Sequence, residues 1–265
     1  MINIILDFDG TLTDTENEAR PFLKKWNELF SEKTGVPVKC LENSIAEAKA
    51  AILSDTKKGW MNNGYVAAPA TADPYILNST IFQYLSEKFR NEGKYDIPKD
   101  DNYLQDLFIQ AYPYSTISFR KGAKELLGSL VQKYNVNIVT NSKAGLVKKK
   151  ITKLGNYDIP VIGDAKKYVI FGSESIILEG FPRQVFLGRD NYRKILDKFI
   201  PEETLVIGDI YELDLALPEY LGFHTCLIGT SSTPFYEIMH QSRIPKGYYA
   251  ADCEEFIKAV LPILH

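Results

Sequence analysis

The sequence predicts an α/β protein, in which a parallel β-sheet carries helices on both faces and a helical segment is inserted once. Short apolar runs rich in β-branched residues alternate with helix-like segments through the second half of the chain. One further run of this kind lies at the N-terminus, over residues 2–6. The residues between these two regions are helical in character.

The predicted strands are short apolar runs bounded by turns or helices, as is typical of strands that are buried on both faces. They cover residues 2–6, 135–140, 159–163, 184–188, 204–208 and 224–229. Segments with apolar residues at helical spacing accompany them. These predicted helices cover residues 122–133, 146–154, 191–199, 214–221 and 253–264. Strands connected by helices are expected to run parallel.

The insertion is predicted to be entirely helical over residues 15–117. Phe22, Trp26, Leu29 and Phe30 follow the i, i+4, i+7, i+8 spacing of one helix face. Residues 44–53 and 79–89 are also helical in character, and no comparable strand pattern occurs between them. We therefore predict an α/β core domain over residues 1–14 and 118–265, interrupted by a helical domain.

The composition is that of an ordinary soluble protein. Thirty-one Lys and Arg residues against 34 Asp and Glu give a net charge of -3, so neither nucleic acid nor a membrane is expected as a partner. Residues 2–6 are too few to span a bilayer and lack the features of a signal peptide. Three widely spaced cysteines form no metal-binding pattern. We expect a cytoplasmic protein, either a monomer or a homodimer.

Polar residues follow four of the predicted strands. They are Asp7 and Asp9 after residues 2–6, Thr140 and Asn141 at the end of 135–140, Arg189 after 184–188, and Asp209, with Asp214 close behind, after 204–208. Ligands of open parallel sheets bind beyond the carboxyl ends of the strands. One such residue alone would more often be a helix cap or a loop residue, but the whole set predicts a single site.

This set of residue types suits phosphoryl transfer. Mg²⁺ prefers oxygen ligands, which Asp7 and Asp209 could supply together with a substrate phosphate. A carboxylate that faces a metal-neutralised phosphate can act as a nucleophile. The carboxyl group of Asp9 could then protonate the leaving oxygen and activate water. Thr140 and Arg189 could hold the phosphate oxygens, and we include Asn141 in the same group.

Three segments resemble motifs of the haloacid dehalogenase superfamily. "DFDGTLTD" (7–14), "VTNS" (139–142) and "IGDIYELD" (207–214) are similar to its first, second and fourth motifs, in the same order and each after an apolar run. The insertion directly after the first motif resembles members with a C1-type helical cap. The resemblance implies a Rossmann-like, doubly wound core with an inserted cap domain.

The resemblance also implies roles for individual residues. Asp7 would be the nucleophile, Asp9 the general acid/base and Thr140 a phosphate ligand. Asp7, the backbone carbonyl of Asp9 and Asp209 would hold Mg²⁺, with Asp214 completing the acidic motif. Dehalogenase-type members lack an acid at the position of Asp9, so its presence favours phosphate ester chemistry.

The third motif of the superfamily departs from the pattern here. It normally provides a lysine before a helix, some twenty residues ahead of "GD", and Arg189 stands at that place. Lys194 is a second candidate for this cation, and Lys166 and Lys167 are further ones. We predict Arg189, because a guanidinium can neutralise phosphate charge. The basic run at 148–153 is expected to be a solvent-exposed helix face.

The sequence thus predicts a Mg²⁺-dependent phosphatase that acts on a small phosphorylated metabolite through an aspartyl-phosphate. A phosphomutase of the same superfamily would use the same acids and stays open as an alternative. A non-catalytic binding or regulatory protein would have no need for the complete set of acids. A receiver-like domain also uses acids at strand ends, but it would leave the insertion and the paired "DFD" unexplained.

Overall fold

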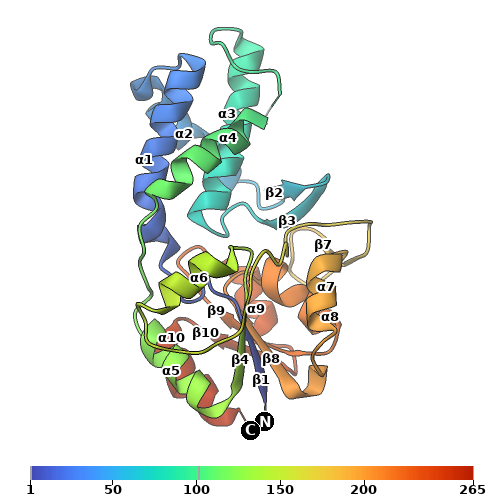
Figure 1. Ribbon diagram of the computed structural model, residues 1–265. Helices are drawn as coiled ribbons and strands as arrows, with labels where there is room; N and C mark the ends of the chain where they lie inside the picture. Colours follow the sequence, from blue (N-terminus) through green and yellow to red (C-terminus); the bar gives the residue numbers. More distant parts are fainter. Residues whose placement is uncertain (1, 101, 265) are drawn as a thin grey trace. The chain divides into compact units, whose positions relative to one another are not determined.

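The computed structural model describes residues 2–100 and 102–264 (Figure 1). Met1 and His265, the outer limits of the predicted core domain, lie outside the described residues. The chain divides into two compact units. The α/β unit comprises Met1–Asp14, Met61–Pro69 and Phe119–His265, and the helical unit comprises Thr15–Trp60 and Ala70–Ser118.

A six-stranded sheet forms the centre of the α/β unit, in the order β10-β9-β8-β1-β4-β5. Its strands are β1 (Asn3–Leu6), β4 (Asn135–Val139), β5 (Val161–Ile162), β8 (Thr204–Gly208), β9 (His224–Ile228) and β10 (Gly247–Ala250). All neighbouring strands pair in parallel, which confirms the predicted sheet. The edge strand β10 was not predicted, because its sequence "GYYA" contains no β-branched residue.

Helices connect these strands or follow the last of them. They are α5 (Ala123–Lys133), α6 (Ala144–Ile151), α7 (Asp190–Leu196), the 3₁₀ turn η2 (Pro201–Glu203), the π-helical turn η3 (Tyr211–Leu215), α8 (Ala216–Tyr220), α9 (Phe235–Gln241) and α10 (Cys253–Glu255), which continues through η4 (Phe256–Val260) and η5 (Leu261–Ile263). Most were predicted to within a few residues. The exceptions are η2 and α9, two short segments outside the predicted helices.

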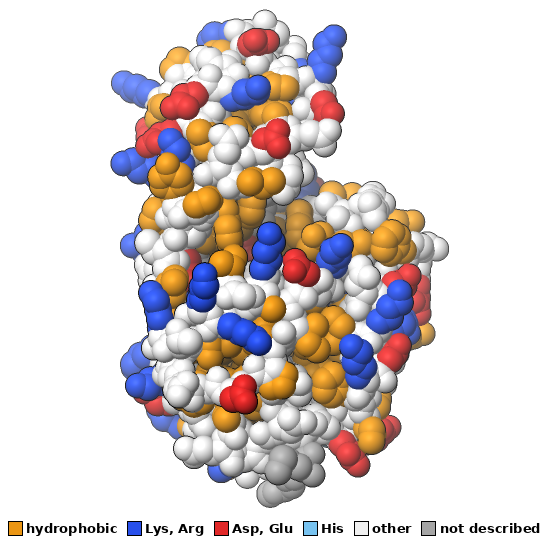
Figure 2. All heavy atoms as spheres, in the orientation of Figure 1, with side chains coloured by type: hydrophobic (Ala, Val, Ile, Leu, Met, Phe, Trp, Pro, Cys, Tyr) orange, Lys and Arg blue, Asp and Glu red, His pale blue; other side chains and the backbone are white. Residues whose placement is uncertain are grey.

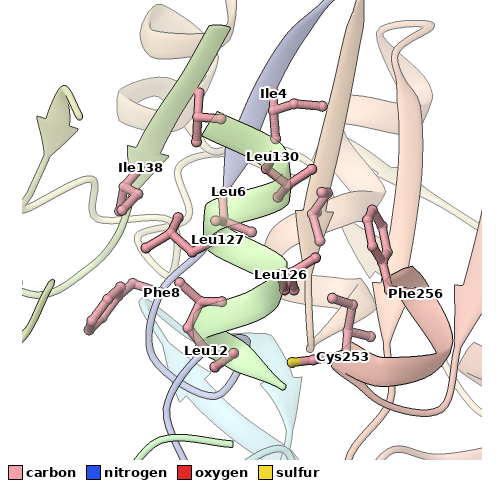
Figure 3. Packing of buried hydrophobic residues seen from close by; sticks show 14 of the residues in the cluster. Ile4, Leu6, Phe8, Leu12, Leu126, Leu127, Leu130, Ile138, Cys253 and Phe256 are labelled. Carbon is pink, nitrogen blue, oxygen red and sulfur yellow. The ribbon is translucent and has the colours of Figure 1, made fainter. Parts of the chain in front are cut away.

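The sheet is covered by apolar side chains on both faces, because successive residues of a strand point to opposite sides. On one face Ile4 and Leu6 of β1 pack with Leu126 and Leu130 of α5 (Figure 3). On the other face Ile5 belongs to a separate cluster, which includes buried residues of α7 and α8. Two clusters on opposite faces confirm the doubly wound arrangement.

The predicted strand 184–188 does not belong to the main sheet. Its centre, β7 (Val185–Phe186), pairs antiparallel with β6 (Ser175–Ile176) in a separate two-stranded sheet. Backbone hydrogen bonds of Phe171 to Gly188 (2.7 Å) and of Leu187 to Glu174 (2.8 Å) extend this local pairing. The backbone groups of residues 184–188 thus bond to residues 171–176. This segment therefore does not end at the edge of the main sheet where β1, β4 and β8 end.

The helical unit consists of α1 (Thr15–Thr34), α2 (Val38–Leu53), α3 (Pro74–Glu92), α4 (Asn102–Ala111) and the 3₁₀ turn η1 (Tyr112–Tyr114). The predicted apolar face of α1 is its core, where Phe22, Trp26 and Phe30 are fully buried. Asp73 caps α3 by accepting a hydrogen bond from the amide of Ile76 (2.7 Å). Gly93 ends this helix in the left-handed conformation.

The insertion is not entirely helical, contrary to the prediction. β2 (Gly59–Asn62) and β3 (Tyr65–Pro69) form a two-stranded sheet whose turn, Asn63-Gly64, has positive φ at both residues. Asn-Gly is the residue pair that such tight turns favour, so the signal was present in the sequence. The side chains of Asn62 and Asn63 bond to the backbone of Ile170, which ties the hairpin to the α/β unit.

In the part of the chain that the structure describes, no helix combines the length and the apolar character needed to cross a membrane. The face seen in Figure 2 carries both acidic and basic side chains, with hydrophobic and uncharged side chains between them.

We predict that Leu127→Ala lowers the free energy of unfolding by about 2–5 kcal/mol, because it removes a fully buried side chain between α5 and the sheet. The control is Leu146→Ala on α6, whose side chain is 46% exposed and should lose no more than about 0.5 kcal/mol. Urea unfolding measures both. Equal losses would contradict the packing described for α5.

Candidate active site

The site is built at the carboxyl ends of three adjacent strands. β1 lies between β4 and β8, and Leu6 pairs with Ile138 on one side and Ile207 on the other. The amide of Asp7 continues this ladder by bonding to the carbonyl of Ile207 (2.8 Å). The residues that follow these strands therefore emerge side by side, as the sequence predicted.

Three buried carboxylates gather at this edge. Asp7, Asp209 and Asp214 are 7%, 3% and 2% exposed, and each has an oxygen within 4.8 Å of an oxygen of the others. The Thr11 hydroxyl lies 3.1 Å from Asp7 Oδ2 and 3.0 Å from Asp209 Oδ1. A hydroxyl has one proton, so Thr11 can donate to only one of these acids at a time.

Lys167 supplies a buried cation to this acid cluster. Its Nζ lies 2.6 Å from Asp7 Oδ1 and 2.8 Å from Asp214 Oδ1. Burial by itself would lower the pKa of Lys167, but Asp214 and Asp7 outweigh it and raise the pKa above its usual value. Lys167 is therefore a permanent positive charge between two carboxylates.

The acid cluster carries an excess of negative charge when its carboxyl groups are ionised, and this raises the pKa of two of them. Burial, Asp214 and Asp9 raise the pKa of Asp7 and Lys167 lowers it, and together they bring it to about 7. Burial likewise raises the pKa of Asp209 well above its usual value, with Asp7 and Asp214 adding to the effect. Three carboxylates and one ammonium leave two negative charges when all are ionised. A divalent cation with oxygen ligands fits this donor set.

Asp9 occupies a different environment from Asp7. Its side chain is 30% exposed and accepts a hydrogen bond from the hydroxyl of Thr140 (3.1 Å). Lys150 of α6 lies 3.3 Å from its other oxygen. Lys150 is part of the basic run that we expected to be solvent-exposed, but its side chain is only 16% exposed. Sequence reasoning missed it, because nothing in a run of lysines shows which one points toward the sheet edge.

Asn141 positions the segment that carries the lysine. Its side-chain oxygen accepts a hydrogen bond from the amide of Lys167 (2.8 Å). The preceding Lys166 has a φ of 49°, an uncommon conformation for a residue with a side chain, and its own side chain is exposed. The backbone thus turns sharply after β5 and directs Lys167 inward.

Arg189 does not reach the acid cluster, contrary to the prediction. Its guanidinium is 1% exposed and donates to the backbone carbonyls of Phe186, Lys167, Ala67 and Glu212. It follows β7, which lies outside the main sheet. Lys194 on α7 is exposed and does not join the cluster either. The structure therefore places Lys167, the cation after β5, where the sequence assigned Arg189.

Glycine is required at position 10 by both space and conformation. Gly10 has a φ of +88°, and a Cβ there would lie 2.2 Å from Asp209 Oδ2. Its carbonyl accepts a hydrogen bond from Arg120 (3.1 Å), a second cation that sequence reasoning missed. The turn after β1 is thus fixed directly against the acid cluster.

Comparison with known proteins identifies a protein family whose model matches most of the chain. The family model for haloacid dehalogenase-like hydrolases matches residues 3–222. No curated protein is significantly similar to the chain.

Solved structures share the fold at low sequence identity. One is the magnesium-bound structure of YfnB from Bacillus subtilis, provisionally described as a HAD-hydrolase, with a TM-score of 0.57, 16% identity and 99% of each chain covered. Another is a protein from Thermotoga maritima, provisionally described as a beta-phosphoglucomutase, with a TM-score of 0.53, 12% identity and 100% of each chain covered. At these identities the similarity concerns the fold alone.

We predict that Gly10→Ala destabilises the protein more than Gly35→Ala does. Both glycines have positive φ, but a Cβ at Gly35 meets nothing within 4 Å. Gly35→Ala should therefore lose only about 1 kcal/mol from backbone strain, whereas Gly10→Ala adds the clash with Asp209. Urea unfolding of the two variants measures the difference, and equal losses would mean that Gly10 is not in close contact with Asp209.

We predict that Lys167→Met lowers the free energy of unfolding by about 3–5 kcal/mol at pH 8 in a chelating buffer, because it leaves buried carboxylates without their cation. The loss should be smaller at pH 6. A folded-state pKa of about 7 for Asp7 already exceeds its unfolded value, and losing Lys167 raises it further. The folded variant therefore binds protons as the pH falls, which stabilises it.

Urea unfolding at both pH values tests this effect, with Lys194→Met as the exposed control. The control should change the free energy of unfolding by no more than about 0.5 kcal/mol. A Lys167→Met loss that is small, or that grows toward pH 6, would contradict the electrostatic role.

Proposed function

The chain belongs to the family of haloacid dehalogenase-like hydrolases, and we propose that it is a Mg²⁺-dependent phosphatase that hydrolyses a small phosphorylated metabolite. One observation carries the proposal: two acids of one short turn have different surroundings. Asp7 is buried and held by Lys167 and Thr11, whereas Asp9 is partly exposed and held by Thr140 and Lys150. Two carboxylates in different environments are suited to two different roles.

In the first half of the proposed reaction, a carboxylate oxygen of Asp7 attacks the phosphorus of the substrate. The bond between phosphorus and the ester oxygen breaks, and Asp9 in its protonated form gives its proton to that oxygen, so the alcohol leaves. Lys167 holds Asp7 in place through the hydrogen bond to Oδ1. The product of this half-reaction is an aspartyl-phosphate at Asp7.

In the second half, water attacks the phosphorus of the aspartyl-phosphate. Asp9, now a carboxylate, accepts the proton of this water, and the bond between phosphorus and Asp7 breaks. Inorganic phosphate is released, and both acids return to their starting states. In this proposal Thr140, whose hydroxyl donates to Asp9, also holds a phosphate oxygen; its contact with Asp9 supports this role.

The acid cluster fits the magnesium ion that this chemistry requires. Asp7, Asp209 and the backbone carbonyl of Asp9 would hold the ion, with Asp214 fixed behind them by Lys167 and by the amide of Ile210. When bound, Mg²⁺ neutralises the charge of the phosphate group so that an anionic nucleophile can approach it.

Asp9 is the reason to propose an ester of phosphoric acid over a haloacid as the substrate. An alkoxide is a poor leaving group and needs a proton as it departs, whereas a halide leaves without one. A proton donor two residues from the nucleophile therefore matches phosphate ester cleavage. A phosphomutase would need the same donor, so the fate of the phosphoryl group separates these two activities.

Several sequence-based expectations stay predictions. They concern the C1-type cap assigned to the helical insertion, the phosphate contacts of Asn141, the cytoplasmic location, a monomeric or homodimeric state and the absence of nucleic-acid and membrane partners. A non-catalytic protein on the same fold is the remaining alternative, and the assay below distinguishes it.

We predict that the protein releases inorganic phosphate from one or more members of a panel of phosphorylated metabolites, in a reaction that stops when EDTA removes Mg²⁺. Asp7→Asn should abolish this turnover, at least about a thousandfold, because an amide is not a competent nucleophile. Phosphate release measured by a colorimetric assay gives the rates. Circular dichroism checks that the variant stays folded.

The matched control is Asp190→Asn, which changes an exposed carboxylate at the start of α7. It should hydrolyse at the wild-type rate. Folded Asp7→Asn with normal turnover would refute the nucleophile assignment. Isomerised substrate without accumulating phosphate would identify a mutase, and no activity on any substrate would favour the non-catalytic alternative.

A further inference from the structure

The turn that carries Asp209 and Asp214 begins with backbone amides that need partners. It leaves β8 and enters the π-helical turn η3, whose first amides have no acceptor within the turn itself. The amide of Ile210 bonds to Asp214 Oδ2 (3.2 Å). The next two amides, of Tyr211 and Glu212, bond to a separate acceptor.

That acceptor is the carboxylate of Glu237 in α9. Its Oε2 lies 3.1 Å from the amide of Tyr211, and its Oε1 lies 3.4 Å from the amide of Glu212. Glu237 is completely buried, although α9 is a short helix that the sequence did not predict. A buried carboxyl group that accepts two backbone hydrogen bonds constrains the position of that backbone, because either amide would otherwise be left without an acceptor.

The helix that carries Glu237 is itself fixed to the sheet. α9 packs beside β9 (Figure 1), and Gln241 donates from one turn further along to the carbonyl and the hydroxyl of Thr225, at 2.9 and 2.8 Å. The carboxylate of Glu212 pairs with Arg183 (2.5 Å) and accepts from Tyr236 of α9 (3.3 Å), and its carbonyl accepts from Arg189 (2.9 Å). The acidic turn is thus held by α9 and by two arginines.

We propose that Glu237 is a positioning residue that holds the turn from Ile210 to Glu212, and thereby keeps Asp209 and Asp214 at the spacing needed to bind a divalent cation. It acts only through backbone amides and contacts neither the cation nor the substrate. This inference rests on the proposed function, because it assumes that the acid cluster binds Mg²⁺.

The test is Glu237→Leu, which keeps the volume similar but leaves the two amides without an acceptor. We expect Mg²⁺, titrated alone in a calorimeter, to bind about 10–100-fold more weakly than to the wild type. Glu237→Gln retains one oxygen acceptor and should recover most of this loss. Amide hydrogen exchange at Tyr211 and Glu212 should be faster in Glu237→Leu than in the wild type.

Thr204→Val is the matched control, because it removes a buried hydroxyl that donates to the carbonyl of Ile200 (2.7 Å) at the start of β8, without touching α9 or the acidic turn. It should lower the free energy of unfolding but leave Mg²⁺ affinity within twofold. A folded Glu237→Leu with wild-type affinity would overturn the inference, as would an equal loss of affinity in the control.

If Glu237→Leu does not fold, Glu237→Gln decides. Because glutamine keeps only one of the two oxygen acceptors, one of the two amides should still exchange faster than in the wild type, and wild-type exchange at both amides would refute the positioning role. If the wild type binds no Mg²⁺, the proposed function fails. Amide hydrogen exchange at Tyr211 and Glu212, compared between variant and wild type, then tests by itself whether Glu237 holds the turn.

Discussion

The structure of the α/β unit depends on bringing three like charges together in a buried place. Carboxylates removed from water repel one another strongly, and each is stable there only with donors or cations at close range. Lys167 and Thr11 contact the acids directly, and Glu237 holds the backbone that carries two of them. These three buried polar residues thus offset the repulsion between the carboxylates or hold the backbone that carries them.

The sequence was sufficient for the parts of the site that follow from strand pairing. β1, β4 and β8 are strongly apolar and lie side by side, so Asp7, Thr140 and Asp209 could be grouped from their positions alone. The sequence was insufficient where the course of a long connection decides which side chain reaches the site. The segment after β5 has two adjacent lysines, and only its three-dimensional course turns Lys167 inward and leaves Lys166 outside.

The misplacement of Arg189 has the same physical origin. A short apolar run predicts a strand, but not which partner its backbone groups will find, and β7 bonds to the nearby β6 instead of the main sheet. The guanidinium nevertheless serves the site indirectly. By donating to the carbonyls of Lys167, Glu212 and Ala67, it joins the lysine segment, the acidic turn and the β2–β3 hairpin in one hydrogen-bonded cluster.

The hairpin has a consequence for how this chain could be recombined with its relatives. Because Met61–Pro69 belongs to the α/β unit, the backbone crosses between the two units at residues 14–15, 60–61, 69–70 and 118–119. The helical unit is therefore two segments and not one cassette. A chimaera that exchanged the whole of residues 15–118 would also remove the Ala67 carbonyl and leave part of a buried guanidinium without its acceptor. An exchange of the helical unit that keeps this hydrogen bond must therefore leave the hairpin in place.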